Sequence, residues 1–150
     1  MIHLQQLDRE HFRILFEIAK VVEPFSAGAI AFEQYAATMT EREGFVIARG
    51  EEIIGCITFS DYYPGVNIVI HCTVDPRYQK RWVTRELLKI IGWYVFNELD
   101  CVRMTAISIV GKSDYAEELL KHIGFTYEGT MRKGVKLADG EFCDVKSFGL

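Results

Sequence analysis

Apolar residues recur at helical spacing in four segments of the chain. The spacing predicts helices over residues 8–22, 27–39, 84–99 and 113–123. Asp8 can cap the first helix and Pro24 stops it. Ser113 and Gly124 are suited to begin and end the last helix in the same way.

Runs rich in β-branched and aromatic residues predict strands over residues 2–7, 44–50, 51–63, 65–74, 102–110, 125–132 and 142–149. Turn residues separate the second, third and fourth runs, at Gly50 and again at Pro64 and Gly65. These three strands are therefore expected to form an antiparallel meander. Asp139 and Gly140 provide the turn between the last two strands.

The order of elements is strand, two helices, three strands, helix, strand, helix and two strands. This order predicts an α/β (α+β) fold with a mixed, mostly antiparallel sheet of about seven strands and about four flanking helices. The strand, helix and strand over residues 65–110 imply one parallel pair, because such a crossover joins parallel neighbours. The sheet is expected to splay at this pair, where the N-terminus of a helix offers free N–H groups to a ligand.

Composition indicates one soluble globular unit over residues 1–150. The chain is 49% hydrophobic and 25% charged, which is ordinary for such proteins. Its apolar runs are too short to span a bilayer, and its first residues lack the pattern of a secretory signal, so a cytoplasmic location is expected. The four cysteines are scattered singly, so we expect neither disulfides nor a metal site.

The segment V-D-P-R-Y-Q-K-R-W-V-T-R-E-L-L, residues 74–88, contrasts with a net charge of −4 because it gathers four cations between Arg77 and Arg85. It lies at a strand-to-helix turn, where phosphate-binding loops occur, but it contains no glycine. Phosphates are bound there by main-chain N–H groups, and neither Trp82 nor Thr84 removes one. The simpler interpretation is a tryptophan that anchors the turn and a solvated basic helix face.

The sequence resembles the GNAT superfamily of N-acetyltransferases. The resemblance rests on the segment above, on S-D-Y-A-E-E-L-L-K-H-I-G-F, and on E-G-T-M-R followed by D-G-E-F-C-D. The order of elements agrees over nearly the whole chain. The pattern GF-x-x-EG-x-x-R and G-x-x-x-D, from Gly124 to Asp144, is similar to the RimJ/RimL-like branch.

The resemblance implies that acetyl-CoA is the cosubstrate and that the loop binds its pyrophosphate. Gln79 occupies the first position of the family's loop motif, and Trp82 and Thr84 stand where the family has small residues. Trp82 must therefore point away from the phosphates. The resemblance assigns coenzyme binding to Gln79, Lys80, Arg81, Trp82, Val83, Thr84, Arg85 and Ser113, the last of which replaces a usual asparagine.

The resemblance also places the thioester beside Cys72, Thr73 and Val74 at the end of the fourth strand, where a backbone amide polarises its carbonyl group. Leu120 stands where many relatives have a tyrosine that protonates the leaving thiolate. His71 is the candidate general base, because it lies near the thioester and histidine titrates near neutral pH. A lone histidine in an apolar strand is, however, more often a core residue.

Further candidates for the acceptor pocket are Glu33 and Tyr127, which we also considered as catalytic groups, and Asp61 and Tyr62. The predicted function is transfer of an acetyl group to a primary amine, at a protein N-terminus or on a small molecule, by direct attack in a ternary complex. The alternatives are a GNAT-like module that binds CoA or a protein without catalysis, and a nucleic-acid-binding module. The net acidity disfavours the latter. A homodimer is compatible with these expectations.

Overall fold

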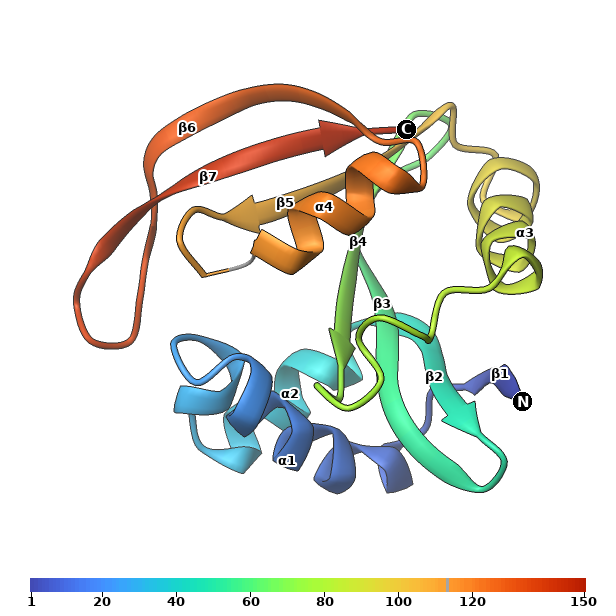
Figure 1. Cartoon of the computed structure of the whole chain (residues 1–150), viewed down its shortest axis with the longest axis horizontal. Helices are drawn as coiled ribbons and strands as arrows, with labels where there is room; N and C mark the ends of the chain where they lie inside the picture. The colour runs from blue at the N-terminus through green and yellow to red at the C-terminus, as the bar shows by residue number, and fades with distance from the viewer. Residues whose placement is uncertain (113) are drawn as a thin grey trace.

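A single mixed sheet runs through the structure, a computed structural model that describes residues 1–112 and 114–150 (Figure 1). Its strand order is β1-β2-β3-β4-β5-β7-β6. Among the strands that the structure describes, only β4 and β5 are parallel, so the mixed, mostly antiparallel sheet predicted from sequence is confirmed. The strands are β1 (Ile2–Gln6), β2 (Glu43–Arg49), β3 (Glu52–Tyr63), β4 (Asn67–Val74), β5 (Arg103–Ile109), β6 (Thr126–Lys136) and β7 (Phe142–Gly149).

The helices α1 (Phe12–Val22), α2 (Phe32–Thr40), α3 (Arg85–Trp93) and α4 (Asp114–His122) cover both faces of this sheet. A 3-10 turn at Arg9–His11 precedes α1, and a π-helical turn at Tyr94–Glu98 extends α3. Among the described residues, no helix combines the length and apolar character needed to cross a membrane.

The second predicted helix is wrong in its first half. Residues Ala27–Ala29 form a separate 3-10 turn, and the backbone of Ile30 and Ala31 is extended before α2 begins. The turn lies directly on α1, since a Cβ atom at Gly28 would be 2.4 Å from the carbonyl oxygen of Ala19. This contact between distant residues fixes the chain direction, and the local hydrophobic spacing does not reveal it.

Two apolar cores lie on opposite faces of the sheet. One contains Leu15, Phe16 and Tyr35 from α1 and α2, and the other contains Leu87 and Ile91 from α3. Side chains of successive strand residues alternate between the two cores. The sheet therefore separates an α1 and α2 side from an α3 and α4 side.

The parallel strands β4 and β5 are paired only at their beginnings. Register pairs join Asn67 to Arg103, Ile68 to Met104 and Val69 to Thr105. The side chain of Thr105 also donates a hydrogen bond of 2.8 Å to Asn67, which holds the two strands together at this end. Beyond this point β5 runs along β7, whereas β4 turns away from it (Figure 1). The predicted splay is therefore present, with residues 70–74 of β4 along one side.

Candidate active site

The loop between β4 and α3 is built from two successive turns. The amide of Tyr78 donates to the carbonyl of Asp75, and that of Arg81 to the carbonyl of Tyr78, both at 2.9 Å. Thr84 then caps α3, because its side-chain oxygen accepts a hydrogen bond of 3.1 Å from the amide of Leu87. The amides of residues 82–86 donate to no group that the structure describes. The start of α3 thus presents unpaired N–H groups at the positive end of its dipole.

Trp82 points away from these amides. Its side chain is only 4% exposed and belongs to the core under α3, with Leu87 and Ile91. Its indole Nε1 has no hydrogen-bond partner among the described residues. The orientation required for phosphate binding is therefore the one observed, and the indole ring anchors the loop to the core.

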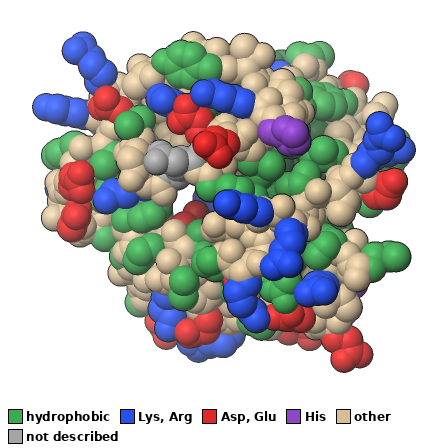
Figure 2. Space-filling view, viewed as in Figure 1, with side chains coloured by type: hydrophobic (Ala, Val, Ile, Leu, Met, Phe, Trp, Pro, Cys, Tyr) green, Lys and Arg blue, Asp and Glu red, His purple; other side chains and the backbone are tan. Residues whose placement is uncertain are grey.

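A cavity of about 700 Å3 lies between this loop, α3 and α4. It brings together five of the predicted coenzyme-binding residues, Gln79, Lys80, Val83, Thr84 and Arg85. Figure 2 shows Lys and Arg side chains gathered over the region of the loop, beside a hollow near the centre of this face. The cavity is lined further by Leu88, Lys89, Tyr115, Leu119, His122 and Ile123.

The basic residues of the loop have two different roles. Lys80 and Arg85 line the cavity. Arg77 instead forms ion pairs with Glu52 at 2.7 Å and Asp75 at 2.9 Å, and the Arg81 guanidinium donates to the carbonyl of Arg77 at 3.2 Å. Arg77 and Arg81 therefore stabilise the loop. The resemblance assigned Arg81 to coenzyme binding, but Arg81 does not line the cavity.

The end of β4 separates its side chains between the two faces of the sheet. Thr73 points toward α1, where its hydroxyl donates to the carboxylate of Glu23 at 3.3 Å. Cys72 points to the α4 side, where its thiol is close enough to Tyr115 to influence the pKa of that phenol. Although surface-accessible, the Cys72 thiol is crowded by protein, and this burial raises its pKa to about 12. A thiol with this pKa is a poor nucleophile at neutral pH.

Tyr115 is a functional candidate that sequence reasoning missed. It lies on the side of α4 that lines the large cavity, together with Leu119 and His122, whereas Leu120 packs against the core under α3. Burial raises the pKa of Tyr115, and the Trp82 indole N–H, which lies near the phenol without forming a hydrogen bond to it, opposes this effect. Glu117 fixes α4 to the sheet through an ion pair of 3.0 Å with Lys146 of β7. The spacing of four residues between Tyr115 and Leu119 was the available sequence signal.

A second missed group, Glu23, lies at the end of α1. Burial raises the pKa of its carboxyl group, against the hydrogen bond from Thr73 and the positive charge of Arg42. Tyr35 of α2 lies in the same region, and its pKa is raised by burial first and then by Cys56 and Glu23, against the positive charge of Arg42. Arg42 donates a long hydrogen bond of 3.5 Å to the buried hydroxyl of Thr58. These groups form a polar cluster on the α1 and α2 side of the splay.

His71 also faces this side. Its Nε2 atom lies 2.7 Å from the hydroxyl of Ser60, which itself donates to Asp61 at 2.7 Å. Since the hydroxyl has one proton, Nε2 must carry the hydrogen in the His71 contact. Burial, together with Arg42, lowers the pKa of His71 to about 4, so the imidazole is neutral at pH 7.

A smaller cavity of about 410 Å3 lies beside this polar cluster, between α2, the segment after α1 and the tip of the β6 and β7 hairpin. The tip is joined to that segment by a hydrogen bond of 3.1 Å from the amide of Ala138 to the carbonyl of Phe25. Arg42 and Tyr35 line this cavity as well as the cluster.

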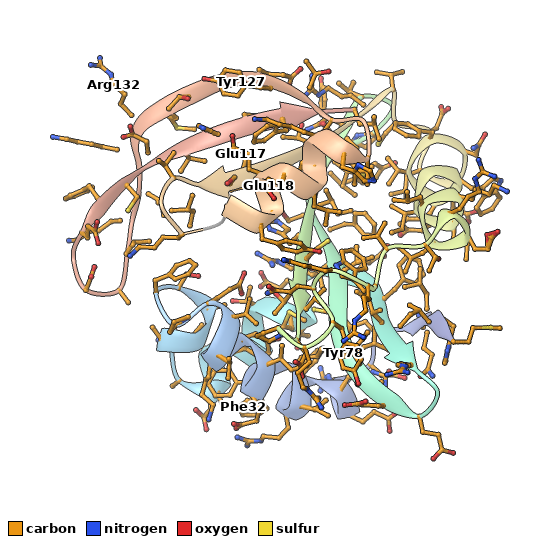
Figure 3. The ribbon with its side chains drawn as sticks, viewed as in Figure 1. Phe32, Tyr78, Glu117, Glu118, Tyr127 and Arg132 are labelled. Carbon is orange, nitrogen blue, oxygen red and sulfur yellow. The ribbon has the colours of Figure 1, made fainter. Side chains whose placement is uncertain are left out.

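The remaining predicted residues lie elsewhere. Glu33 is exposed on the first turn of α2 and lines neither cavity. Tyr127 lies on β6 (Figure 3) and is 49% exposed. Its hydroxyl contacts that of Thr130 at 2.6 Å. Tyr62 donates to the carbonyl of Leu99 at 3.0 Å. Ser113 lies outside the described residues.

Comparisons with known proteins agree with this geometry. The sequence matches the acetyltransferase (GNAT) family over residues 4–125. A sequence search of curated proteins gives no match. This chain therefore belongs to the acetyltransferase (GNAT) family and is an acyltransferase.

Solved structures share its fold. The crystal structure of a candidate acetyltransferase matches with a TM-score of 0.82 and 19% identity, over 99% of this chain and 85% of that one. A variant of spermidine N-acetyltransferase from Vibrio cholerae matches with a TM-score of 0.79 and 18% identity, over 99% and 92% of the two chains. A GNAT acetyltransferase from Bacillus anthracis matches with 0.77 and 14%, over 99% and 93%. At these identities the likeness shows the fold alone.

Proposed function

We propose that this protein transfers an acetyl group from acetyl-CoA to a primary amine while both substrates are bound. The proposal rests on one arrangement: the end of β4, which is unpaired on its β5 side, leads directly to the unpaired amides of α3 and to the basic cavity beside them. Such an arrangement suits a long ligand with phosphates at one end and a strand-like arm at the other.

The residues present fit the coenzyme. Its pyrophosphate would lie against the amides of residues 82–86, with Lys80 and Arg85 as counter-charges. Its amide-containing arm would run along residues 72–74, where β4 lacks a neighbouring strand on the β5 side. When bound, the coenzyme supplies an acyl group activated as a thioester. The raised pKa of Cys72 favours direct attack by the acceptor over transfer through this thiol.

The acceptor amine would approach from the α1 and α2 side. There the ammonium group gives one proton to the Glu23 carboxylate, whose raised pKa makes it a better proton acceptor than an ordinary carboxylate. The neutral nitrogen then forms a bond to the thioester carbonyl carbon as the carbon–sulfur bond breaks. Water carries the second proton away from the nitrogen.

Tyr115 would protonate the leaving sulfur from the opposite side. Its phenol stays protonated because burial raises its pKa, and it lies near Cys72 on the cavity side of α4. The phenolate left behind recovers the proton that water carried from the nitrogen. Tyr115 thus takes the role that the family pattern assigned to position 120.

His71 is the alternative proton acceptor that the sequence suggested. Its neutral imidazole can accept a proton only at Nδ1, because Nε2 already carries a hydrogen toward Ser60. A pKa of about 4 makes it a weaker base than Glu23. We therefore assign His71 to positioning Ser60 and Asp61 beside the amine.

The tail pattern from Gly124 to Asp144 is our reason for placing the protein in the RimJ/RimL-like branch. Its residues, however, also have structural roles in their own turns and strands. The backbone of Gly124 and Gly140 has positive φ, and Asp144 accepts a hydrogen bond of 2.9 Å from the amide of Lys133. These roles would preserve the pattern whatever the acceptor is.

A thermal melt with acetyl-CoA tests coenzyme binding. Ligand at about a hundred times its dissociation constant should stabilise the fold by about 2.7 kcal/mol, which raises the melting temperature by about 5 to 10 °C. Release of free thiol with a panel of primary amines then tests transfer. No melting shift at millimolar acetyl-CoA would overturn the proposed site. A shift without thiol release from any amine would overturn the amine as acceptor.

A further inference from the structure

Arg42 has a guanidinium without a charged partner. It is half-buried and forms no ion pair with any carboxylate that the structure describes. Among the described residues, the one side-chain hydrogen bond of its guanidinium is that of 3.5 Å to Thr58, which leaves most of its five N–H donors unused. Donors that are partly withdrawn from water favour an acceptor from a ligand.

The cavity of about 410 Å3 beside Arg42 has a consistent character. Lys136 also lines it, and no acidic side chain that the structure describes does. The rest of the lining is largely apolar and includes Phe25, Ile30, Met39 and Leu137. Its volume falls within the range of about 300 to 1,000 Å3 that small-molecule sites occupy. The cavity therefore suits a compact apolar group joined to an anion and disfavours a polycation.

Arg42 links this cavity, which it lines, to the proposed site of amine attack. Arg42 is close enough to Glu23 to lower the pKa of that carboxyl group, although the two form no ion pair. Glu23 in turn contacts Thr73 at the end of β4. A cation and an anion thus lie in the same region without forming an ion pair, so each is able to bind one end of a zwitterion.

We propose that the acceptor is an α-amino acid with a large apolar side chain. Its carboxylate binds Arg42, its side chain fills the cavity beneath the β6 and β7 hairpin, and its amino group meets Glu23. Lys136, at the exposed rim, adds a weaker attraction for the carboxylate. This inference rests on the proposed function and specifies its substrate class.

Three acceptor amines, compared by kcat/KM in the thiol-release assay, test this substrate class. L-Phenylalanine has the carboxylate, L-phenylalaninamide lacks it, and spermidine is a polycation. We expect phenylalanine to have a kcat/KM about thirty-fold or more above that of its amide, and spermidine to be no better than the amide. An amide that reacts as well as the acid, or a preference for spermidine, would overturn the inference while the proposed acetyl transfer stands.

Variants locate the carboxylate site. Arg42→Gln should lower kcat/KM for phenylalanine by about thirty-fold or more and leave that for phenylalaninamide nearly unchanged. Lys136→Gln should cost less than about five-fold. Arg132→Gln is the matched control, because Arg132 projects from β6 into solvent (Figure 3), and it should change neither substrate. An equal loss for both substrates in Arg42→Gln would contradict carboxylate binding.

A binding measurement separates recognition from catalysis. N-acetyl-L-phenylalanine, the expected product, should raise the melting temperature of the wild-type protein but not that of Arg42→Gln, and N-acetyl-phenylalaninamide should raise neither. If Arg42→Gln does not fold, Arg42→Lys retains the charge and should show a smaller loss. Equal shifts from both products would overturn the inference. Acetyl-CoA binding without acetylation of any amine would overturn it together with the proposed transfer.

Discussion

The side chains of Glu23 and Thr73 are hydrogen-bonded at 3.3 Å, which joins the end of α1 to the splayed end of β4. The two residues are fifty positions apart in sequence. Their contact places a partly buried carboxylate next to the strand along which the thioester would lie. This contact links the proposed acceptor side of the site to its proposed acyl side.

Replacement of Glu23 by Gln should remove the proton acceptor and keep its shape. General-base catalysis contributes about 10²- to 10⁴-fold, so we expect kcat/KM to fall by at least about a hundred-fold. Glu17→Gln, on the exposed side of α1, is the control and should behave like the wild type. Steady-state thiol release checks both variants.

The pH dependence of the same reaction has a defined direction. Glu23 must be ionised to accept the proton, and burial raises its pKa above the ordinary 4.5. Wild-type kcat/KM should therefore fall as the pH drops through this raised pKa, and Glu23→Gln should lose that limb of the profile. An unchanged limb in the variant would assign the base to another group.

His71 should make the fold sensitive to acid. Its pKa is about 4 in the folded state against an ordinary 6.5, so the folded protein binds fewer protons between these values. The contribution of His71 to the free energy of unfolding, about 3 kcal/mol, is therefore fully present above pH 6.5 and is lost as the pH falls through 4. Urea unfolding at several pH values should show this slope in the wild type and its loss in His71→Gln. An equal dependence of stability on pH in the wild type and in His71→Gln would show that His71 does not have this lowered pKa.

The order of the elements, the meander of β2 to β4 and the splay could be predicted from the sequence, and so could the free amides of the loop after β4, because each depends on local periodicity or on main-chain groups. Thr84 and Trp82 lack the small side chains of the family pattern, yet the amides remain unpaired as expected. Only the structure shows where the indole lies, since its partners Leu87 and Ile91 are apolar like many other residues.

The acceptor side could not be predicted, because its contacts join segments that are distant in sequence. Glu23 meets Thr73, and Arg42 meets Thr58, only after the sheet has formed. Position 120 was selected by the family pattern, whereas the orientation of α4 brings Tyr115 to the cavity. Arg77 was similarly assigned to the basic patch, although Glu52 of a neighbouring strand binds it.

The two tryptophans offer a matched test of the loop anchor. Trp82 is 4% exposed and Trp93 is 58% exposed. Trp82→Ala should lower the free energy of unfolding by about 3 to 5 kcal/mol, because it leaves a cavity in the core under α3. Trp93→Ala should change it by no more than about 0.5 kcal/mol. Similar losses in urea unfolding would contradict the burial difference.

Thr84→Ala should affect both stability and coenzyme affinity. Loss of the cap on α3 costs about 1 kcal/mol, and the first turn that presents the amides becomes less well ordered. We expect a smaller melting shift with acetyl-CoA than in the wild type, and recovery in Thr84→Ser. Thr40→Ala removes a hydroxyl that donates within α2 at 2.8 Å, and it should leave the acetyl-CoA shift intact. Equal shifts in Thr84→Ala and the wild type would separate the cap from the phosphate site.

Tyr115→Phe tests the proton donor on the other side of the splay. The change removes only the hydroxyl, so the cavity lining and the acetyl-CoA melting shift should persist. Because the thiolate then has no positioned acid, kcat should fall by about a hundred-fold or more, with little change in KM for acetyl-CoA. Tyr63→Phe removes a hydroxyl from an exposed tyrosine of β3 and should leave kcat unchanged. Retention of kcat in Tyr115→Phe would contradict the assignment and leave water or His122 of the same cavity as the proton donor, because Leu120 packs in the core and has no proton to give.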